Sequence, residues 1–183
     1  MWVIDQNGTV SVQLTLEQMD TVYRVRDRWC QMWRNDIVLV ARYLERRKRF
    51  GTTMTDQQLL DEHYNDKMPG AIMAEMGTAQ FLGAPWLMRI KPELSNPTDV
   101  DGIEVRAVDS MHKCLLTNPY DKPAPYVLGV YDIGTATVLL RGWLHLRHCN
   151  VAAHARNGIY LTPATALHPM VMLRDEYQRR KRR

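Results

Sequence analysis

Residues 97–106 have the sequence Pro-Thr-Asp-Val-Asp-Gly-Ile-Glu-Val-Arg, and this stretch carries the strongest local signal in the chain. An Asp-Gly pair between β-branched residues is typical of a two-residue β-hairpin turn. With positions 101 and 102 in the turn, Asp99 lies directly opposite Glu104 on one face of the hairpin. We therefore predict two short antiparallel strands that present a pair of carboxylates.

The closeness of these two carboxylates has a chemical consequence. Directly opposite side chains in a hairpin have Cβ atoms about 5 Å apart, and like charges at that spacing repel. A cation between Asp99 and Glu104 removes the repulsion, and Arg106 projects from the same face two residues further on. Carboxylate oxygens favour Mg²⁺ or Mn²⁺, and such an ion activates water and neutralises charge on a phosphate. The alternative is an exposed surface hairpin whose acids are neutralised by Arg106 and nearby lysines.

The chain around the hairpin divides into a helical first half and a strand-rich second half. Apolar spacing and capping residues predict helices over residues 16–44 (with a break at Asn35-Asp36), 56–64 and 70–83. An Asn-Gly turn predicts a hairpin in residues 2–14, and period-two alternation predicts strands at 103–108, 114–116, 126–131 and 137–144. These elements predict an α+β fold in which N-terminal helices pack on a mixed, mostly antiparallel central sheet.

Three regions follow from this order of elements. Residues 1–68 form an N-terminal hairpin and helical region packed on the core, residues 69–173 form the core, and residues 174–183 form a basic C-terminal tail. Five of the 24 Lys and Arg residues lie in the last five positions, which leaves 19 against 20 Asp and Glu. The net charge of +4 is therefore a property of the tail.

Length and composition limit the classes of protein to which the chain can belong. With 183 residues, 45% of them apolar and 24% charged, it fits one globular domain rather than a disordered chain. Its apolar runs are too short to span a bilayer, and no secretory signal pattern follows Met1. The three cysteines, Cys30, Cys114 and Cys149, are scattered and odd in number, which is typical of reduced thiols. We therefore expect a cytoplasmic protein that does not associate with membranes.

Glu75 adds a third carboxylate. It lies in a predicted helix that is small and apolar on nearly every side, and Ile72 and Ala79 share its face. A carboxylate on a buried helix face is costly unless it is paired or bound to a metal. The structural alternative is a core glutamate that forms a salt bridge with Arg89 or Arg106.

The order of these acids resembles the PD-(D/E)xK phosphodiesterase superfamily, which has the restriction-endonuclease-like fold. Compact phage and bacterial members carry Gly-x-x-x-Glu-x-x-x-Ala on a helix, followed by Asp…Glu-x-Lys on paired strands. This chain has Gly70-Ala-Ile-Met-Ala-Glu-Met-Gly-Thr-Ala79, in which the glycine is displaced by one residue, followed by Asp99…Glu104-Val-Arg106. The strand pair and Gly-Trp turn that often follow are similar to segments 126–130 and 140–144, so the resemblance covers about half of the chain.

The resemblance implies a metal-dependent nuclease that hydrolyses phosphodiester bonds of DNA, with Mg²⁺ or Mn²⁺ as cofactor. Its implied metal ligands are Glu75, Asp99, Glu104 and the carbonyl of Val105. Its implied catalytic residues are Asp99, Glu104 and Arg106.

The chain departs from the superfamily pattern at Arg106, where the family has lysine. Arginine stays protonated and cannot serve as a general base, although it can hold a phosphate or orient water. Lys113, on the next predicted strand, is a candidate for a migrated amine, and Asp101 is an alternative to Asp99 as the first acid. A second hypothesis follows from this departure: a catalytically inactive nuclease fold that binds nucleic acid or a partner protein.

Two basic clusters are candidates for nucleic-acid contacts. The first, at the end of the long predicted helix, contains Arg46, Arg47, Lys48 and Arg49; the second, at the C-terminus, contains Arg179, Arg180, Lys181, Arg182 and Arg183. Such runs bind the phosphate backbone without regard to sequence, so binding should depend strongly on salt. The alternatives are a favourable charge at the end of a helix for the first cluster and a solubilising tail for the second.

Other groupings of reactive residues indicate weaker hypotheses. A cluster of His145, His148, Cys149 and His154 contains zinc-ligand types, but the spacing matches no established zinc pattern, so exposed strand-end histidines are the simpler reading. Cys149 as a nucleophile lacks a recognisable context. A third hypothesis is an assembly protein, in which the amphipathic helix over residues 16–44, with Trp29 and Trp33, forms the interface of a homo-oligomer.

Overall fold

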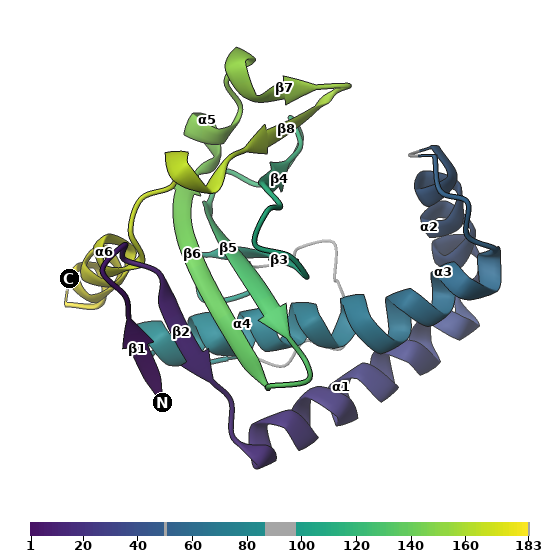
Figure 1. Ribbon diagram of the computed structural model, residues 1–183, viewed down its shortest axis with the longest axis horizontal. Coiled ribbons are helices and arrows are strands. Elements are labelled where there is room, and N and C mark those ends of the chain that lie inside the picture. The colour runs from purple at the N-terminus through teal and green to yellow at the C-terminus, as the bar shows by residue number, and fades with distance from the viewer. Residues whose placement is uncertain (50, 87–97, 183) are drawn as a thin grey trace.

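The computed structural model describes residues 1–49, 51–86 and 98–182, and it has an α+β architecture (Figure 1). The main sheet has the strand order β1-β2-β6-β5-β3. Its strands are β1 (Trp2–Ile4), β2 (Val10–Gln13), β6 (Thr137–His145), β5 (Pro125–Asp132) and β3 (Glu104–Val108). All neighbours are antiparallel except β3 and β5, which run parallel. The predicted fold class, helices packed on a mixed and mostly antiparallel sheet, is confirmed.

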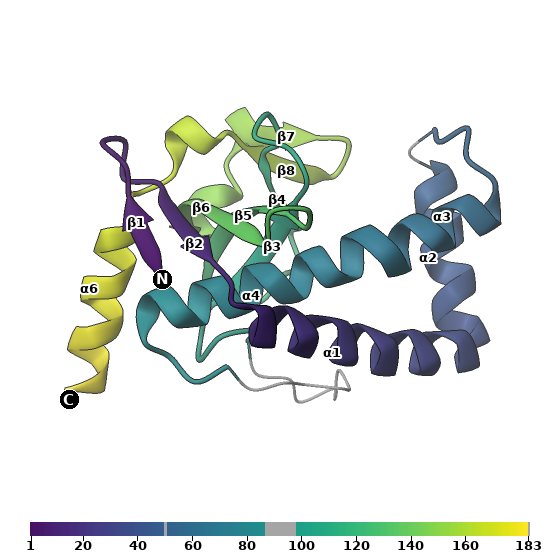
Figure 2. The same cartoon turned by 60° about the horizontal axis from the view of Figure 1, so that its bottom comes forward.

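Helix α4 (Met68–Leu82) crosses one face of the main sheet and contacts β2, β3, β5 and β6. Helix α1 (Leu16–Asn35) packs on α4 from the side away from the sheet, as Figure 2 shows. The close approach of α4 depends on small residues, because a Cβ at Gly70 would lie 2.3 Å from the ring of Tyr131 and one at Gly129 would lie 2.9 Å from Ala74. The core of the protein therefore lies between this sheet and α4.

The predicted break before residue 70 is wrong, because the chain is helical without interruption from residue 56 to residue 82. Helix α3 (Asp56–Glu62) passes through a π-helical turn, η1 (His63–Lys67), directly into α4. In this turn the amide of Met68 donates to the carbonyl of His63, one residue beyond the α-helical partner. The wider turn accommodates Pro69, which has no amide hydrogen and whose ring crowds the preceding turn of an ordinary α-helix.

The first helix begins and ends where the sequence predicts. Thr15 forms a capping box with Gln18, and the helix stops at Asp36, after which α2 (Ile37–Arg49) begins. Trp29 and Trp33 are partly buried against the core of the same chain, and α2 has no buried residue. A homo-oligomer through this region stays a prediction, and the two tryptophans are already engaged within the chain.

A second, small sheet was not predicted. It has the order β4-β8-β7, formed by β4 (Leu115–Thr117), β8 (Ile159–Thr162) and β7 (Ala155–Arg156). The turn between β7 and β8 is Asn157-Gly158, with φ values of 49° and 81°. This is the same kind of hairpin signal as the one at positions 101 and 102. The short elements α5 (Leu146–Cys149) and η2 (Ala152–His154) connect the main sheet to the small sheet, and η3 (Ala164–Ala166) connects the small sheet to the last helix.

The last helix, α6 (Met170–Lys181), contains most of the basic C-terminal run. Its residues Met170, Leu173 and Tyr177 are buried, and the helix packs on β6 and α4. The expected boundary between residues 173 and 174 therefore falls inside a docked helix. Within the described residues, no helix is both long enough and apolar enough to cross a membrane.

Candidate active site

The hairpin at residues 99–104 forms as predicted. Val100 and Ile103 form an antiparallel bridge with reciprocal hydrogen bonds of 2.9 Å. Asp101 and Gly102 occupy the turn with φ values of 39° and 93°. This conformation suits an Asp-Gly pair, since both central residues of a type I′ turn need positive φ.

The hairpin brings Asp99 beside the first residues of β3. The carboxylate oxygen Oδ2 of Asp99 accepts a hydrogen bond of 2.8 Å from the backbone amide of Val105. Glu104, the first residue of β3, is only 7% exposed and lies in register with Tyr126 of the parallel strand β5. Its oxygen Oε1 is buried and accepts no hydrogen bond from any residue that the structure describes. The ammonium group of Lys122 lies 3.5 Å from this oxygen.

Glu75, which lies on α4, is close enough to Asp99 and Glu104 for their charges to act on it. Its oxygen Oε2 accepts a hydrogen bond of 3.3 Å from the indole nitrogen of Trp86. Among the described residues, no arginine or lysine forms an ion pair with Glu75; Arg89, one of the two expected alternatives, lies outside those residues. The structure therefore gives no support to the salt-bridge alternative with Arg106.

The three carboxylates act on one another electrostatically. Burial and the charges of Asp99 and Glu104 together raise the pKa of Glu75 to about 8, against the opposing hydrogen bond from Trp86. Burial also raises the pKa of Asp99 above its ordinary value, although the amide of Val105 opposes the shift. Burial and the charge of Asp99 raise the pKa of Glu104. The helix and the hairpin thus bring together three acids that repel in the ionised state.

Two cationic side chains lie beside this carboxylate cluster, which consists of Glu75, Asp99 and Glu104. Arg106 Nη1 is 3.9 Å from Glu104 Oε2, but Arg106 Nη2 donates to Asp121 Oδ2 at 3.1 Å. Lys122 Nζ is 3.5 Å from Glu104 Oε1, a separation suited to an ion pair rather than to a well-formed hydrogen bond. No motif in the sequence marks Lys122, because it lies 18 positions beyond Glu104 in a loop between strands.

The donor set of the cluster fits a hard divalent cation, because it consists of carboxylates whose repulsion such an ion would relieve. Asp99 and Glu104 come from facing positions of the hairpin, and Val105, the expected carbonyl ligand, follows Glu104 in β3. Within the described residues, however, no three His, Cys, Asp or Glu side chains are arranged as a metal-binding group. The Mg²⁺ or Mn²⁺ site therefore stays a prediction.

Two alternative residues lie away from the cluster. Asp101 points to α6, where its Oδ2 accepts a hydrogen bond of 2.7 Å from Tyr177 and lies 2.9 Å from Lys181 Nζ. Lys113, the candidate for a migrated amine, forms an ion pair with Asp109 at the other end of β3. The structure thus places Asp99, rather than Asp101, beside Glu104, and it places Lys113 away from the carboxylate cluster.

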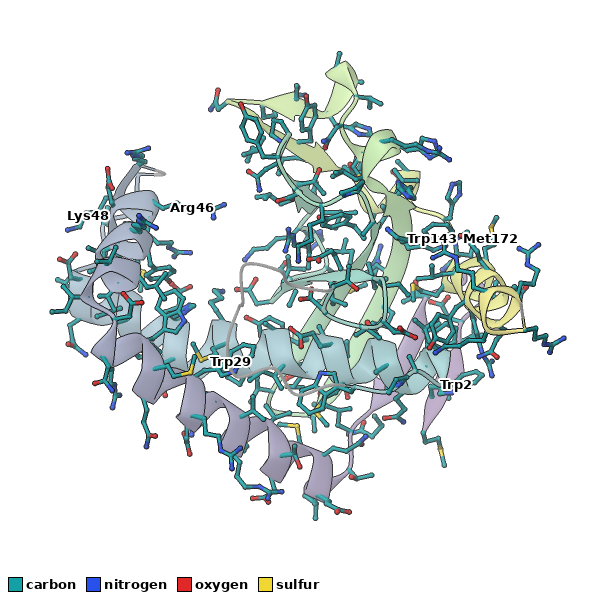
Figure 3. The ribbon with its side chains drawn as sticks, turned by 180° about the vertical axis from the view of Figure 1, so that it is seen from behind. Trp2, Trp29, Arg46, Lys48, Trp143 and Met172 are labelled. Atoms are coloured by element: carbon teal, nitrogen blue, oxygen red, sulfur yellow. The ribbon has the colours of Figure 1, made fainter. Side chains whose placement is uncertain are left out.

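The first basic cluster is largely engaged in ion pairs. Arg47 bridges to Glu62 of α3 at 2.8 Å, and Lys48 bridges to Asp56 at 2.7 Å. Arg49 pairs with Glu45 of its own helix. Arg46 is exposed, and Figure 3 shows it on the side of α2 that faces the small sheet. Arg47 and Lys48 therefore fasten α2 to α3, and Arg46 is better placed to contact a ligand.

The second basic cluster lies at the opposite end of the molecule from α2, as both Figure 1 and Figure 2 show. Arg180 pairs with Glu176 of its own helix, and Lys181 pairs with Asp101. Arg179 is exposed on α6, Arg182 is exposed directly after the end of that helix, and Arg183 lies outside the described residues. The two clusters therefore do not form one continuous surface.

The histidine and cysteine cluster shows no zinc-site geometry among the described residues. Cys149 is fully buried, and burial raises its thiol pKa to about 11, which disfavours the reactive thiolate. His154 interacts through Nδ1 with the carbonyl of Cys149 and the hydroxyl of Thr162, both at 3.2 Å. Cys149 and His154 are therefore accounted for by contacts within the chain.

Comparisons with protein-family models, with curated proteins and with solved structures find no significant match to this chain.

Proposed function

We propose that this protein is a metal-dependent nuclease of the restriction-endonuclease-like fold, which hydrolyses phosphodiester bonds of DNA with Mg²⁺ or Mn²⁺ as cofactor. The observation that supports the proposal most is the convergence of Glu75, Asp99 and Glu104. A helix and a tight hairpin place these acids together, burial and mutual repulsion raise their pKa values, and two cations lie beside them. Perturbed, interacting carboxylates of this kind are typical of functional sites.

In this proposal Glu75, Asp99, Glu104 and the carbonyl of Val105 hold the cation. The ion supplies an activated water and neutralises charge that develops on the phosphate. The amide of Val105 fixes the carboxylate of Asp99 through their hydrogen bond of 2.8 Å. Trp86 fixes that of Glu75 in the same way, at 3.3 Å. These two hydrogen bonds restrain the carboxylates of Asp99 and Glu75.

A catalytically inactive binding module is the second candidate. The observation that favours it is the environment of Arg106, whose guanidinium pairs with Asp121 and lies 5.1 Å from the ring centre of Tyr126. These contacts are explained equally well by an arginine that stabilises the edge of the sheet and has no catalytic role. The same fold could then bind nucleic acid or a partner protein without cleavage.

Cleavage of labelled single- and double-stranded DNA by the purified chain decides between these candidates. We expect products with Mg²⁺ or Mn²⁺ and none with a chelator. The variant Asp99→Asn, purified in the same way, should cleave at least about a hundredfold more slowly. Mutating a residue that only hydrogen-bonds to a metal ligand already lowers activity by up to about a hundredfold, and loss of the ligand itself should lower it at least as much. DNA binding without cleavage by either ion would instead support the binding module. Equal cleavage by both proteins would indicate a contaminating nuclease.

The exposed arginines at the C-terminal end of α6 should contribute to DNA binding. We expect the double variant Arg179→Gln/Arg182→Gln to lower the slope of log affinity against log salt by about two, because each phosphate contact releases about one counterion. Its melting temperature should not change, since both side chains are exposed. Arg47→Gln is the matched control: it should lower the melting temperature by breaking the pair with Glu62 and leave the slope near that of the wild type. Identical slopes for the double variant and the wild type would contradict the assignment.

A further inference from the structure

Lys122 occupies a position beside the carboxylate cluster that no sequence motif indicated. Its Nζ atom lies 3.5 Å from the buried Glu104 Oε1, and its charge lowers the pKa values of both Asp99 and Glu104. The side chain of Lys122 is 43% exposed, so it is partly open to solvent as well as close to the acids. A substrate that approached the cluster from this side would meet Lys122.

The loop that carries Lys122 has a defined conformation. The carbonyl of Lys122 accepts hydrogen bonds from the amide of Ala124 at 2.8 Å and from the hydroxyl of Tyr126 at 3.2 Å. On the other side of Lys122, Asp121 accepts a hydrogen bond of 2.9 Å from the amide of Asn118, and its own amide donates to the carbonyl of Asn118 at 3.1 Å. These contacts fix the backbone from which the lysine extends.

Arg106 contacts residues that hold this loop in place. Its Nη2 atom is 3.1 Å from Asp121 Oδ2, whereas its nearest approach to Glu104 is 3.9 Å. Its guanidinium also lies over the ring of Tyr126, the residue whose hydroxyl holds the carbonyl of Lys122. Arg106, which follows Glu104 by two positions in β3, therefore contacts two of the residues that fix the loop, Asp121 and Tyr126.

We propose that Lys122 is the cationic catalytic residue of the site and that Arg106 is a positioning residue that holds its loop. This inference rests on the proposed nuclease function. The ammonium group of Lys122 donates a hydrogen bond to a non-bridging oxygen of the scissile phosphate and stabilises the charge that develops there. It keeps its proton throughout, so no proton transfer is assigned to it. Arg106 touches no substrate and acts through Asp121 and Tyr126.

The test compares Lys122→Met with Lys122→Arg and with the matched control Lys113→Met, whose amine pairs with Asp109 instead. Lys122→Met should reduce cleavage with Mg²⁺ by about a hundredfold to a thousandfold, and Lys122→Arg should restore part of it. Calorimetric titration of the metal-free proteins should show that Lys122→Met binds Mn²⁺ about threefold tighter or more, because a neighbouring positive charge is gone. Its DNA binding, measured with a chelator present, should lose about one unit of salt slope. Lys113→Met should match the wild type in all three measurements.

The role of Arg106 is tested by substitutions made both in the wild type and in the Lys122→Met variant. Arg106→Lys keeps the charge but loses the planar guanidinium, so it should slow cleavage in the wild type and add little further loss to Lys122→Met. Asp121→Asn should behave in the same way, which keeps the test valid if Arg106→Lys folds poorly. Independent, additive losses would overturn the positioning role.

Failure of this inference can be told apart from failure of the proposed function. If the wild type cleaves DNA and Lys122→Met cleaves it equally well, Lys122 has no catalytic role and the nuclease proposal stands. If Lys122→Met loses cleavage but binds Mn²⁺ more weakly than the wild type, the lysine supports the site structurally, and the inference is overturned. A wild type that does not cleave DNA with either ion overturns both.

Discussion

Replacement of Glu104 by glutamine is expected to abolish metal-dependent cleavage and to leave the metal-free protein at least as stable as before. The side chain is buried, its Oε1 accepts no hydrogen bond from the described residues, and its pKa is raised by burial and by Asp99. Neutralising it relieves like-charge repulsion worth roughly a few tenths to 1 kcal/mol. For a chain of this length, that corresponds to a melting temperature raised by at most about 4 °C.

The same substitution removes a hard anionic ligand, so the cation binds weakly and cleavage should fall at least about a hundredfold. Loss of activity with retained or raised stability is characteristic of a functional site. The measurements are cleavage rates with Mg²⁺ and thermal unfolding with a chelator. A melting temperature that falls in the absence of metal would show instead that the ion pairs of Glu104 with Arg106 and Lys122 stabilise the fold.

Asp109 provides the matched control for Glu104→Gln, because it lies one position beyond β3 but pairs with Lys113 and Lys67. Burial acts to raise its pKa, but hydrogen bonds from these two lysines lower it to about 2. A carboxylate with a lowered pKa stabilises the fold at neutral pH, and this stability is lost as the pH falls through the folded pKa. Asp109→Asn should therefore lower the melting temperature at pH 7 and leave cleavage near the wild-type rate.

The parts of the fold that the sequence predicted are those set by local backbone chemistry. Thr15 and Gln18 satisfy each other's backbone groups at the start of α1, and positive φ at positions 101 and 102 fixes the hairpin register. The convergence of Asp99 and Glu104 follows from that register alone, so it could be predicted. Glu75 was found because a single acid on an otherwise apolar helix requires an explanation.

The residues that the sequence did not reveal depend on pairing between distant segments. Lys122 reaches Glu104 because β3 pairs in parallel with β5, which places the loop before β5 next to the start of β3. A parallel neighbour cannot be inferred from alternation within each strand. Trp86 likewise lies 11 positions beyond Glu75, past the end of α4. The uninterrupted helix through Pro69 was missed because a π-turn leaves no recognisable sequence pattern.

Glu75 is expected to make the metal-free protein less stable as the pH rises. Burial and the neighbouring acids raise its pKa to about 8 from an ordinary value of 4.5. Between these two values the native state keeps a proton that the unfolded chain has released, so stability is fully present below pH 4.5 and is lost as the pH rises towards 8. Above the folded pKa the loss levels off. Asp99 and Glu104, whose pKa values are also raised, act in the same direction.

Glu75→Gln should remove most of this loss of stability with rising pH, because glutamine does not ionise. At pH 9 the variant should be more stable than the wild type by roughly 2–5 kcal/mol, whereas at pH 5 the two should be similar. Urea unfolding from pH 5 to pH 9 with a chelator measures the difference, and Glu17→Gln, an exposed acid at the start of α1, is the control that should follow the wild type. Added Mg²⁺ should flatten the wild-type curve in the same way, because a bound cation stabilises the three ionised carboxylates. Parallel curves for Glu75→Gln and the wild type would mean that Glu75 is ionised and paired in the native state, which would contradict its place in the carboxylate cluster.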